Sequence, residues 1–303
     1  MTDMDRRRAL PRRGFLGALA LFGVAGVISA QPAGCTPSPG SGGDGAPGSG
    51  AAAAGAAIGP PPPGWREVFR DEFGGESLGS HWEAFNGKPS SDPHVRWVSS
   101  MAKVENGSLV LSGAPAYGGW ATGAVSGWRM PRTHGLYEIR MRAIPHRVLS
   151  YHVLLWPADD NWPPEIDLAE GYRADRSRTD AFLHWRDAGG ERRKRGYQVR
   201  VDATKPATWA IEWLPGSVRL LVDGVEFARA DGDPVPDRPM WFGMQIEARA
   251  TVEGTGAPAD NGVTRHTGAP LPQYTVPVLE VDWIRISEPA GAVPPPPSTA
   301  PPA

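Results

Sequence analysis

The sequence is short of cysteine, with one residue, Cys35, in a chain of 303. A single cysteine excludes an intramolecular disulfide and any metal site built on two cysteines. Charge of one sign is also lacking, since 31 basic side chains accompany 33 acidic ones and the formal net charge is −2. Nucleic-acid-binding domains usually carry a basic surplus. We therefore expect no nucleic acid partner.

A long hydrophobic run is missing too. The apolar run Ala18–Ile28 is shorter than the roughly 20 residues that a bilayer span needs. Basic residues precede it, among them Arg12 and Arg13, and this order is typical of an export signal. The arginine pair resembles a twin-arginine signal, and an ordinary secretory signal is the alternative. Either one predicts that residues 1–35 direct the mature protein out of the cytoplasm.

The end of this signal has two interpretations. Ile28–Ala30 suits a general signal peptidase, whereas Ala33–Cys35 resembles the end of a lipobox, after which Cys35 carries a lipid anchor. Pro32 stands where a lipobox usually has an aliphatic residue, but the sole cysteine of the chain falls at this place, so we favour the anchor. The expected product is a cell-surface or periplasmic lipoprotein, or else a secreted protein. It contacts a membrane only through the signal or the lipid.

Proline and tryptophan divide the rest of the chain. Of 33 prolines, 16 lie outside Gly64–Glu288, whereas all 12 tryptophans lie between Trp65 and Trp283. Segments rich in Gly, Ala, Pro and Ser bury too little apolar surface to fold, so we expect a disordered linker over 36–63 and a disordered tail over 289–303. Residues 64–288 are then one folded domain, which we expect to be a monomer.

This domain has no convincing helical pattern. Leu136–Arg142 alternates apolar and polar side chains, as a strand does. Asn106-Gly107 and Asp223-Gly224 separate apolar segments, and such dipeptides are typical of tight hairpin turns. We therefore predict an all-β sandwich or barrel.

Three carboxylates occur within six residues, at Glu165, Asp167 and Glu170. Because side chains alternate along a regular strand, Glu165 and Asp167 share one face and Glu170 lies on the other. A bulge of one residue reverses the alternation and brings Glu170 to the face of the other two. We predict such a bulge, with Ile166 and Leu168 packed inward.

Crowding of these like charges raises the pKa of at least one carboxyl group, which can leave that group protonated near neutral pH. One protonated and one ionised carboxyl group are the pair that glycoside hydrolysis uses. The residues alone leave two other interpretations open, a calcium site and an acidic solvated face near a turn.

Glu165–Glu170 resembles the active-site signature of glycoside hydrolase family 16, of the laminarinase and lichenase kind, in its bulged form. Other segments resemble further strands of that family in the same order: Asp71–Phe73 with Trp82, Asn106–Leu109, Tyr137–Met141, Trp209–Trp213 with Val222–Gly224, and Val281–Arg285. The similarity covers Phe69–Glu288, so residues 64–288 are predicted to be a glycoside hydrolase domain.

The resemblance implies a concanavalin-like β-jelly-roll sandwich in which a curved sheet forms an open glycan cleft. It also implies that Glu165 is the nucleophile, that Glu170 is the general acid/base, and that Asp167 orients the nucleophile between them. Pro163-Pro164 departs from the family, whose members often have glycine there. Because Pro164 has no N–H to donate to a sheet, we expect either a sheet edge or the start of a strand here.

Further site residues are expected around this strand. In the family a histidine at the position of His184 commonly faces the acidic strand, so we expect it to bond Asp167 or Glu170; a structural histidine in a hairpin is the alternative. The candidates to bind sugar are Trp162, Trp185, Trp128, Trp120, Arg129 and Gln245. Tryptophan also fills the cores of β-sandwiches, and that alternative is weakest for Trp162, beside the acids.

Two charged features have a plain and a functional interpretation. Glu191–Arg195 is either a solvated hairpin tip or a surface that attracts an acidic polysaccharide, because positive potential concentrates anionic ligands. Asp282 either helps to bind a structural Ca²⁺, as in some relatives, or is a simple surface carboxylate. We expect no required cofactor.

The expected function is that of a retaining, endo-acting β-glycoside hydrolase. It cleaves a β-linked polysaccharide, with β-glucan as the default, through a glycosyl-enzyme intermediate. One alternative is a transglycosylase that remodels envelope or exopolysaccharide glycans, and another is a non-catalytic carbohydrate-binding module. The sequence leaves the linkage open, because the loops around a cleft decide it.

Overall fold

The structure is a computed structural model that describes residues 58–87, 89, 95–116, 119–248 and 275–291. The predicted export signal, Cys35, and most of the predicted linker and tail lie outside these residues. Among the described residues there is one short 3-10 helix before β4, η2 (Ser99–Met101), and no helix has the length and hydropathy that a membrane span requires.

Within the described part of the chain, the larger of two sheets has ten strands. Eight follow the order β15-β14-β13-β8-β17-β5-β6-β3, while β1 pairs with β17 and β4 pairs with β5. Their bounds are β1 (Trp65–Asp71), β3 (Val95–Trp97), β4 (Ala102–Glu105), β5 (Ser108–Ala116), β6 (Gly119–Thr122), β8 (Gly135–Ala143), β13 (Ala207–Leu214), β14 (Ser217–Val222), β15 (Val225–Asp231) and β17 (Val276–Pro289).

The other sheet has seven strands among the described residues, in the order β12-β11-β10-β9-β16-β7-β2. Their bounds are β2 (Glu83–Ala84), β7 (Ala124–Ser126), β9 (Leu149–Pro157), β10 (Glu165–Gly171), β11 (Arg178–Arg186), β12 (Arg192–Arg200) and β16 (Met240–Ala248). The acidic strand β10 is therefore an inner strand, and β12 is an edge strand.

Hairpins form at the two dipeptides that predict them. Asn106 and Gly107 join β4 to β5 with φ of 53° and 75°. Asp223 and Gly224 join β14 to β15 with φ of 48° and 77°. Both central residues of each turn thus adopt the left-handed conformation that Asn-Gly and Asp-Gly tolerate.

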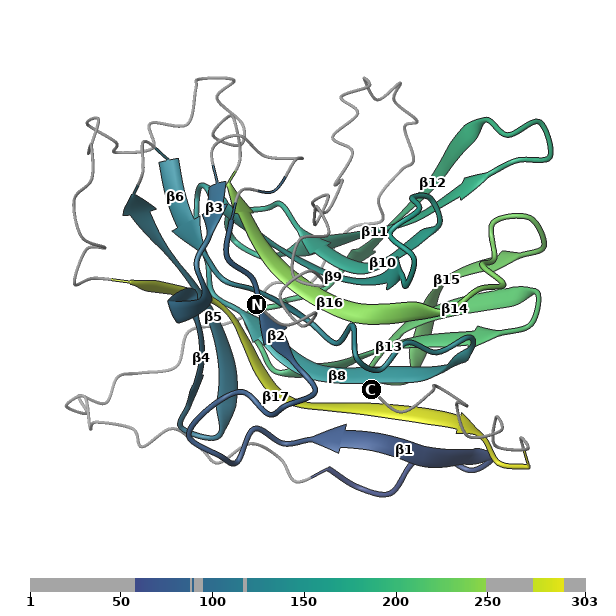
Figure 1. The fold of residues 1–303 in the computed structure, drawn as a ribbon, viewed down its shortest axis with the longest axis horizontal. Helices are drawn as coiled ribbons and strands as arrows, with labels where there is room; N and C mark the ends of the chain where they lie inside the picture. The colour runs from purple at the N-terminus through teal and green to yellow at the C-terminus, as the bar shows by residue number, and fades with distance from the viewer. Residues whose placement is uncertain (1–57, 88, 90–94, 117–118, 249–274, 292–303) are drawn as a thin grey trace, which may run out of the picture.

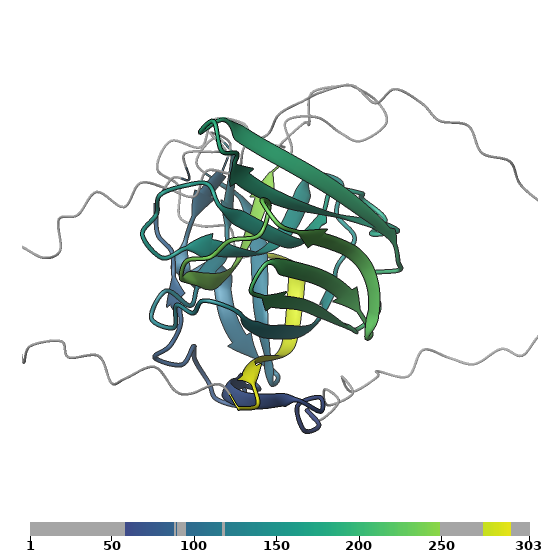
Figure 2. The same cartoon turned by 90° about the vertical axis from the view of Figure 1, so that its right-hand side faces the viewer.

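The two sheets stack face to face, with the apolar core between them (Figures 1 and 2). Tyr137 of β8 and Phe242 of β16 join the layers through stacked rings whose centroids are 6.2 Å apart. Ile139 and Ile284 from one sheet and Val153 from the other are fully buried. The prediction of an all-β sandwich is confirmed, and the barrel alternative is excluded because neither sheet closes on itself.

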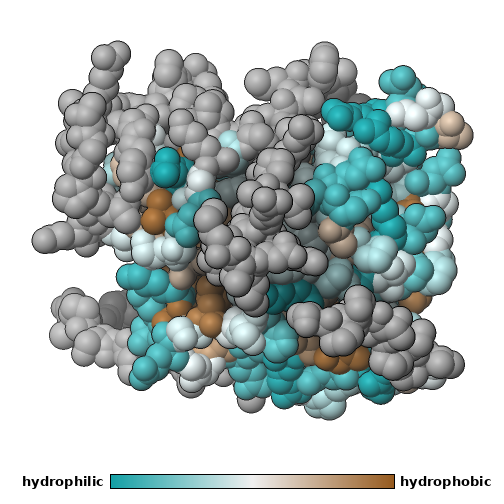
Figure 3. Space-filling view, viewed as in Figure 1, coloured by the Kyte–Doolittle hydropathy of each residue, from teal (hydrophilic) through white to brown (hydrophobic). Residues whose placement is uncertain are grey.

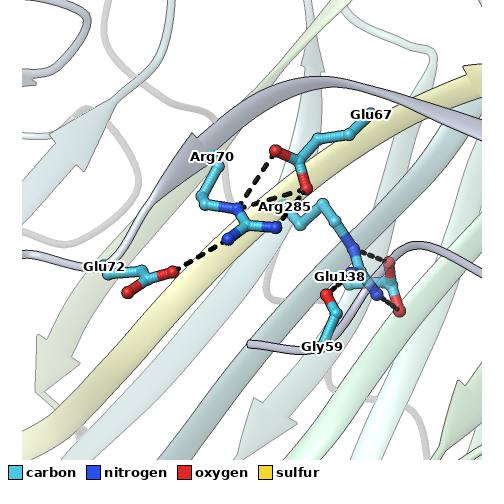
Figure 4. A network of polar contacts seen from close by, with 6 residues as sticks. All are labelled: Gly59, Glu67, Arg70, Glu72, Glu138 and Arg285. Carbon is cyan, nitrogen blue, oxygen red and sulfur yellow. Dashed lines mark hydrogen bonds and ion pairs between the residues drawn. The ribbon is translucent and has the colours of Figure 1, made fainter. Parts of the chain in front are cut away.

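A buried ion pair ties the middle of the larger sheet to the chain that precedes it. Arg285 of β17 lies opposite Glu138 of β8 and donates to both of its carboxylate oxygens, at 2.6 and 2.9 Å. Arg285 also donates to the carbonyl oxygen of Gly59, at 2.7 Å (Figure 4). Both side chains are buried, so each one depends on the other for its hydrogen bonds.

Candidate active site

The bulge predicted in the acidic strand is present. Asp167 pairs with Leu154 of β9, but the pairing shifts before Ala169, and Glu170 then lies opposite His152. The extra residue turns Glu170 to the face that carries Glu165 and Asp167, and all three line one pocket. We call this side of the seven-stranded sheet the acid face.

Burial is nearly complete along β10. Glu165, Asp167 and Glu170 are 3%, 2% and 8% exposed, and the intervening Ile166 and Leu168 are fully buried, as predicted. Buried carboxyl groups need charged or hydrogen-bonded partners, because burial otherwise costs several kcal/mol. Each acid has a partner of a different kind.

Glu165 is held from the segment that leads into the strand. The indole N–H of Trp162 donates to Glu165 Oε2 at 2.7 Å. The strand starts at Glu165, directly after Pro164, as the missing donor of that proline predicts. Trp162 is therefore beside the acids, with its ring 5.5 Å from that of His184.

Asp167 pairs with His184 of β11, whose Nε2 lies 3.2 Å from Asp167 Oδ2. His184 lies directly opposite Glu165 in the ladder between β10 and β11, so it projects onto the acid face. Of the two partners expected for His184, the structure selects Asp167.

Glu170 has the largest set of partners. His152 Nδ1 lies 3.0 Å from Glu170 Oε1, and the hydroxyl of Tyr172 donates to Glu170 Oε2 at 2.6 Å. Both carboxylate oxygens are thus engaged. Behind the histidine, Glu247 Oε2 lies 3.6 Å from His152 Nε2, and Gln245 donates to Glu247 Oε1 at 3.0 Å.

These contacts set the charge of His152. Burial alone lowers the pKa of an imidazole, but the carboxylates of Glu247 and Glu170 outweigh that effect and raise the pKa of His152 to about 9. The imidazole is therefore a buried cation at neutral pH, held between two carboxylates.

The surroundings of the three acids shift their pKa values in different directions. Burial, together with the charge of Asp167, raises the pKa of Glu165 well above its ordinary value. Burial and the charge of Glu170 raise the pKa of Asp167. Burial acts in the same direction on Glu170, but the charge and hydrogen bond of His152 outweigh it and lower the pKa. The prediction that at least one pKa is raised is confirmed, and in the free protein Glu165 holds a proton more tightly than Glu170.

The structure gathers some of the predicted sugar-binding residues and separates others. Gln245 lines the pocket, and Trp162 borders it. Trp128 and Arg129 lie past the end of β7, where Arg129 stacks over the Trp128 ring at 4.4 Å. Trp128, 45% exposed, also donates to Glu83 of β2 at 2.6 Å. This pair lies outside the pocket. It is near the β2 edge of the seven-stranded sheet, and β12 forms the opposite edge.

Two of the predicted sugar-binding tryptophans lie elsewhere. Trp120 belongs to β6 in the larger sheet and is a buried core residue. Trp185 follows His184 in β11, so alternation turns it to the face opposite the acids. Neither indole is placed to bind a glycan at the acids.

Sequence reasoning also missed members of the site. His152, Tyr172, Lys194 and Glu247 all line the pocket. His152 lies in a strand whose side chains are mostly apolar, and its partner Glu247 is remote in sequence. Lys194 belongs to a run of charges, so only the pairing of β12 with β11 shows that it faces the acids.

Two places carry carboxylates that could hold a metal ion. Among the described residues, Glu165, Asp167 and His184 offer ligand atoms within 4.8 Å of one another. Calcium prefers a shell made of oxygen atoms, so a histidine in the set does not fit that ion. At the second place, Arg140 Nε lies 3.3 Å from Asp282 Oδ2. The positive charge of this arginine disfavours binding of a structural calcium ion at Asp282.

Solved structures share the fold. The chain superposes on SCLam, a non-specific endo-β-1,3(4)-glucanase from family GH16, with a TM-score of 0.62 and 17% identity over 76% of this chain and 93% of that one. The laminarinase catalytic domain from Thermotoga maritima gives a TM-score of 0.61 and 18% identity over 75% and 99%. The laminarinase from Rhodothermus marinus gives 0.58 and 23% over 75% and 98%.

Two curated relatives are similar in sequence and are also named as glycanases. Endo-1,3-1,4-beta-glycanase ExsH of Rhizobium meliloti is 23% identical over 59% of this chain and 40% of its own length. Endo-1,3-1,4-beta-glycanase EglC of the same species is 21% identical over 50% and 32%. The resemblance to glycoside hydrolase family 16 is confirmed. So is the family 16 jelly-roll sandwich, although no family model matches the chain. The chain spans less than half the length of these two relatives.

Proposed function

We propose that this protein is a retaining, endo-acting β-glycoside hydrolase that cleaves a β-linked polysaccharide, with β-glucan as the default substrate. One observation carries the proposal: the bulge in β10 puts Glu165, Asp167 and Glu170 on one face, in one pocket. The relatives ExsH and EglC are named endo-1,3-1,4-β-glycanases, and this supports a β-glucan as the polymer to try first.

The chemistry divides between the two glutamates. The carboxylate of Glu165 attacks the anomeric carbon and forms an ester bond, while the glycosidic C–O bond breaks and its oxygen takes a proton from Glu170. Glu170 then removes a proton from a water molecule, whose oxygen attacks the same carbon and releases Glu165. Asp167, held by His184, lies between the two glutamates and orients Glu165.

The resting protonation state must change before this attack. Glu165 holds a proton more tightly than Glu170 in the free protein, whereas the reaction needs an ionised Glu165 and a protonated Glu170. Moving one proton from Glu165 to Glu170 gives the reactive form without any change in total charge. Positive charge that develops at the anomeric carbon favours this form, because it stabilises an ionised Glu165.

A substrate panel tests the proposal. Release of reducing ends from β-1,3-, β-1,4- and mixed-linkage β-1,3-1,4-glucans is measured for the wild type and for Glu165→Gln and Glu170→Gln. Loss of the general acid/base costs about 10²- to 10⁴-fold in kcat, and loss of the nucleophile at least as much. Glu72→Gln, a change at an exposed acid, is the matched control and retains wild-type kcat.

The panel also separates the alternative functions. A transglycosylase yields products longer than the starting chains, so product size distinguishes it from a hydrolase. A carbohydrate-binding module binds a polymer and releases nothing from it. Wild-type kcat in Glu165→Gln or in Glu170→Gln would contradict the assignment of the catalytic residues.

A further inference from the structure

The edge strand β12 carries cations toward the acids. Lys194 lies opposite His184 in the ladder between β11 and β12, and His184 lies opposite Glu165. These three residues therefore form one row across the acid face. Side chains alternate along β12, so Arg192 and Arg200 share the acid face with Lys194, and Arg193 and Arg195 lie on the other.

Two rows of this face place like charges opposite each other. Arg186 of β11 pairs with Arg192, and Arg178 pairs with Arg200. Like charges directly opposite in a ladder are destabilising. Arg178 is partly compensated by Asp180 of its own strand, 3.4 Å away, whereas Arg186 and Arg192 make no ion pair within the described residues. An anion between the guanidinium groups of Arg186 and Arg192 would therefore relieve their repulsion.

These cations are exposed, and the two arginines among them have no ion pair within the described residues. Arg192, Lys194 and Arg200 are all exposed, and within the described residues Arg192 and Arg200 make no ion pair with a carboxylate. The hydrophilic surface of the β11–β12 hairpin is visible at the upper right of Figure 3, where Figure 1 places the two strands. By contrast, Arg193 on the opposite face is paired with Asp187 at 2.6 Å.

The cations on the acid face of β12 lie next to the three acids of β10. Lys194 lines the pocket with Glu165, Asp167 and Glu170. The guanidinium of Arg192 stacks over Trp162, 4.9 Å from the ring centroid, and Trp162 holds Glu165. Two strand spacings of about 4.8 Å separate β12 from β10, so the cations begin about 10 Å from the acids. A glycan that crosses β10 toward this edge meets them next.

We propose that the acid face of β12 binds carboxylate groups carried by the substrate, and that the preferred polymer is an acidic β-glycan rather than a neutral one. Arginine suits this task, because its planar fork matches a carboxylate with two hydrogen bonds. The inference rests on the proposed function, since it names the substrate class of the same site.

Protection of a sheet edge is the competing explanation. Exposed edge strands often carry charges that prevent pairing with other chains. Charges on either face of β12 serve that purpose equally, because both faces border the same edge. A ligand site depends on the acid face alone, and this difference defines the experiment.

The test compares two double variants with the same change in net charge. Arg192→Gln/Arg200→Gln removes two cations from the acid face, and Arg193→Gln/Arg195→Gln removes two from the other face of the same strand. Lys194 is kept, because it lines the catalytic pocket. The probes are a neutral mixed-linkage β-glucan, the same glucan carrying carboxymethyl groups, and a β-1,4-linked polyuronate.

Binding is measured by calorimetry in a Glu165→Gln background, so the result does not depend on turnover. We expect the parent to bind an acidic polymer at least tenfold more tightly than the neutral glucan at low salt, and to lose this preference as salt rises. Arg192→Gln/Arg200→Gln removes most of the preference, whereas Arg193→Gln/Arg195→Gln retains it. Whichever acidic polymer binds identifies the source of the carboxylate, as a substituent or as a backbone uronic acid.

Two results overturn the inference: equal binding of neutral and acidic polymers by the parent, or equal losses in the two double variants. Thermal denaturation of all variants checks folding, and the acid-face variant is expected to be about as stable as the parent, because relief of the Arg186–Arg192 repulsion offsets the lost stacking of Arg192 on Trp162. Failure of the proposed function is seen separately, as absence of cleavage of every polymer by the wild type.

Discussion

At the residue scale, three carboxyl groups of one strand differ because their neighbours differ. Trp162 donates a neutral hydrogen bond to Glu165, and His184 lies beside Asp167. Glu170 alone faces a cation that is locked in place, since His152 is charged by its contacts with Glu170 and Glu247. This histidine decides how readily Glu170 gives up a proton.

His152→Asn removes that cation and keeps a side chain able to donate to Glu170. Loss of the positive charge raises the pKa of Glu170, which is lowered in the wild type. In the free protein Glu165 keeps the last proton of the pair, so the acidic limb of the kcat/KM profile reports Glu170, and this limb is expected to move to higher pH. Ser150→Ala, which removes only the hydroxyl 3.0 Å from His152 Nε2, serves as the control. An acidic limb unchanged in His152→Asn would show that His152 does not govern Glu170.

At the element scale, the bulge of β10 determines which side chains can meet. Gly171 closes the strand opposite Tyr151 of β9, and a Cβ at Gly171 would overlap the Tyr151 ring. That ring is buried, and its hydroxyl bonds Thr179 at 2.9 Å, so it has no room to withdraw. The end of β10, next to Glu170, is therefore fixed by a position that only glycine can occupy.

Gly171→Ala is expected to destabilise the protein by about 1–3 kcal/mol, the usual cost of overpacking. Because Glu170 precedes the altered residue, kcat should fall more than KM rises. Chemical denaturation and steady-state kinetics measure the two effects. Gly75→Ala, where the nearest atom to the new Cβ is a backbone oxygen at 3.7 Å, provides the control. Wild-type stability and kcat in Gly171→Ala would show that β10 can shift without harm.

Strand alternation also explains which parts of the site could be predicted from sequence. Glu165 and Asp167 share one face of a regular strand and Glu170 lies on the other, so a common site requires a bulge. This bulge could be predicted because the argument uses the sequence of β10 alone. His184 and Trp185 are neighbours in one strand, so the same rule puts them on opposite faces, and only His184 faces the acids. His152 and Glu247 meet only because β9 and β16 pair, and spacing along the chain gives no signal of such a contact.

At the scale of the whole molecule, the three acids lie in the seven-stranded sheet, whereas two arginine networks lie at the ten-stranded sheet. Figure 4 shows the two networks, one around Arg285 and one around Arg70. The first is buried, and Arg70 is exposed. Arg285 and Glu138 are 4% and 7% exposed. Arg70 contacts Glu67 and Glu72 at the surface. The two networks look alike, but solvent makes their energies very different.

Arg285→Ala leaves Glu138 buried without a cation and is expected to cost about 3–5 kcal/mol of unfolding free energy. For a domain of this size, each kcal/mol lost lowers the midpoint of thermal unfolding by about 2–4 °C. Arg70→Ala is expected to cost at most about 1 kcal/mol, because its ion pairs are exposed. Calorimetry measures both, with kcat recorded well below the midpoint, where it should match the wild type. Equal losses of stability in the two variants would contradict the distinction between them.

The central claim is that Glu165 and Glu170 carry out a two-step, retaining hydrolysis. Proton NMR of the first products from the polymer that the panel selects tests it most directly, because the configuration at the new reducing end records the number of displacements. We predict that the β-anomer appears first and that the α-anomer grows in later by mutarotation. An α-anomer formed first would mean a single displacement and would contradict a nucleophilic role for Glu165.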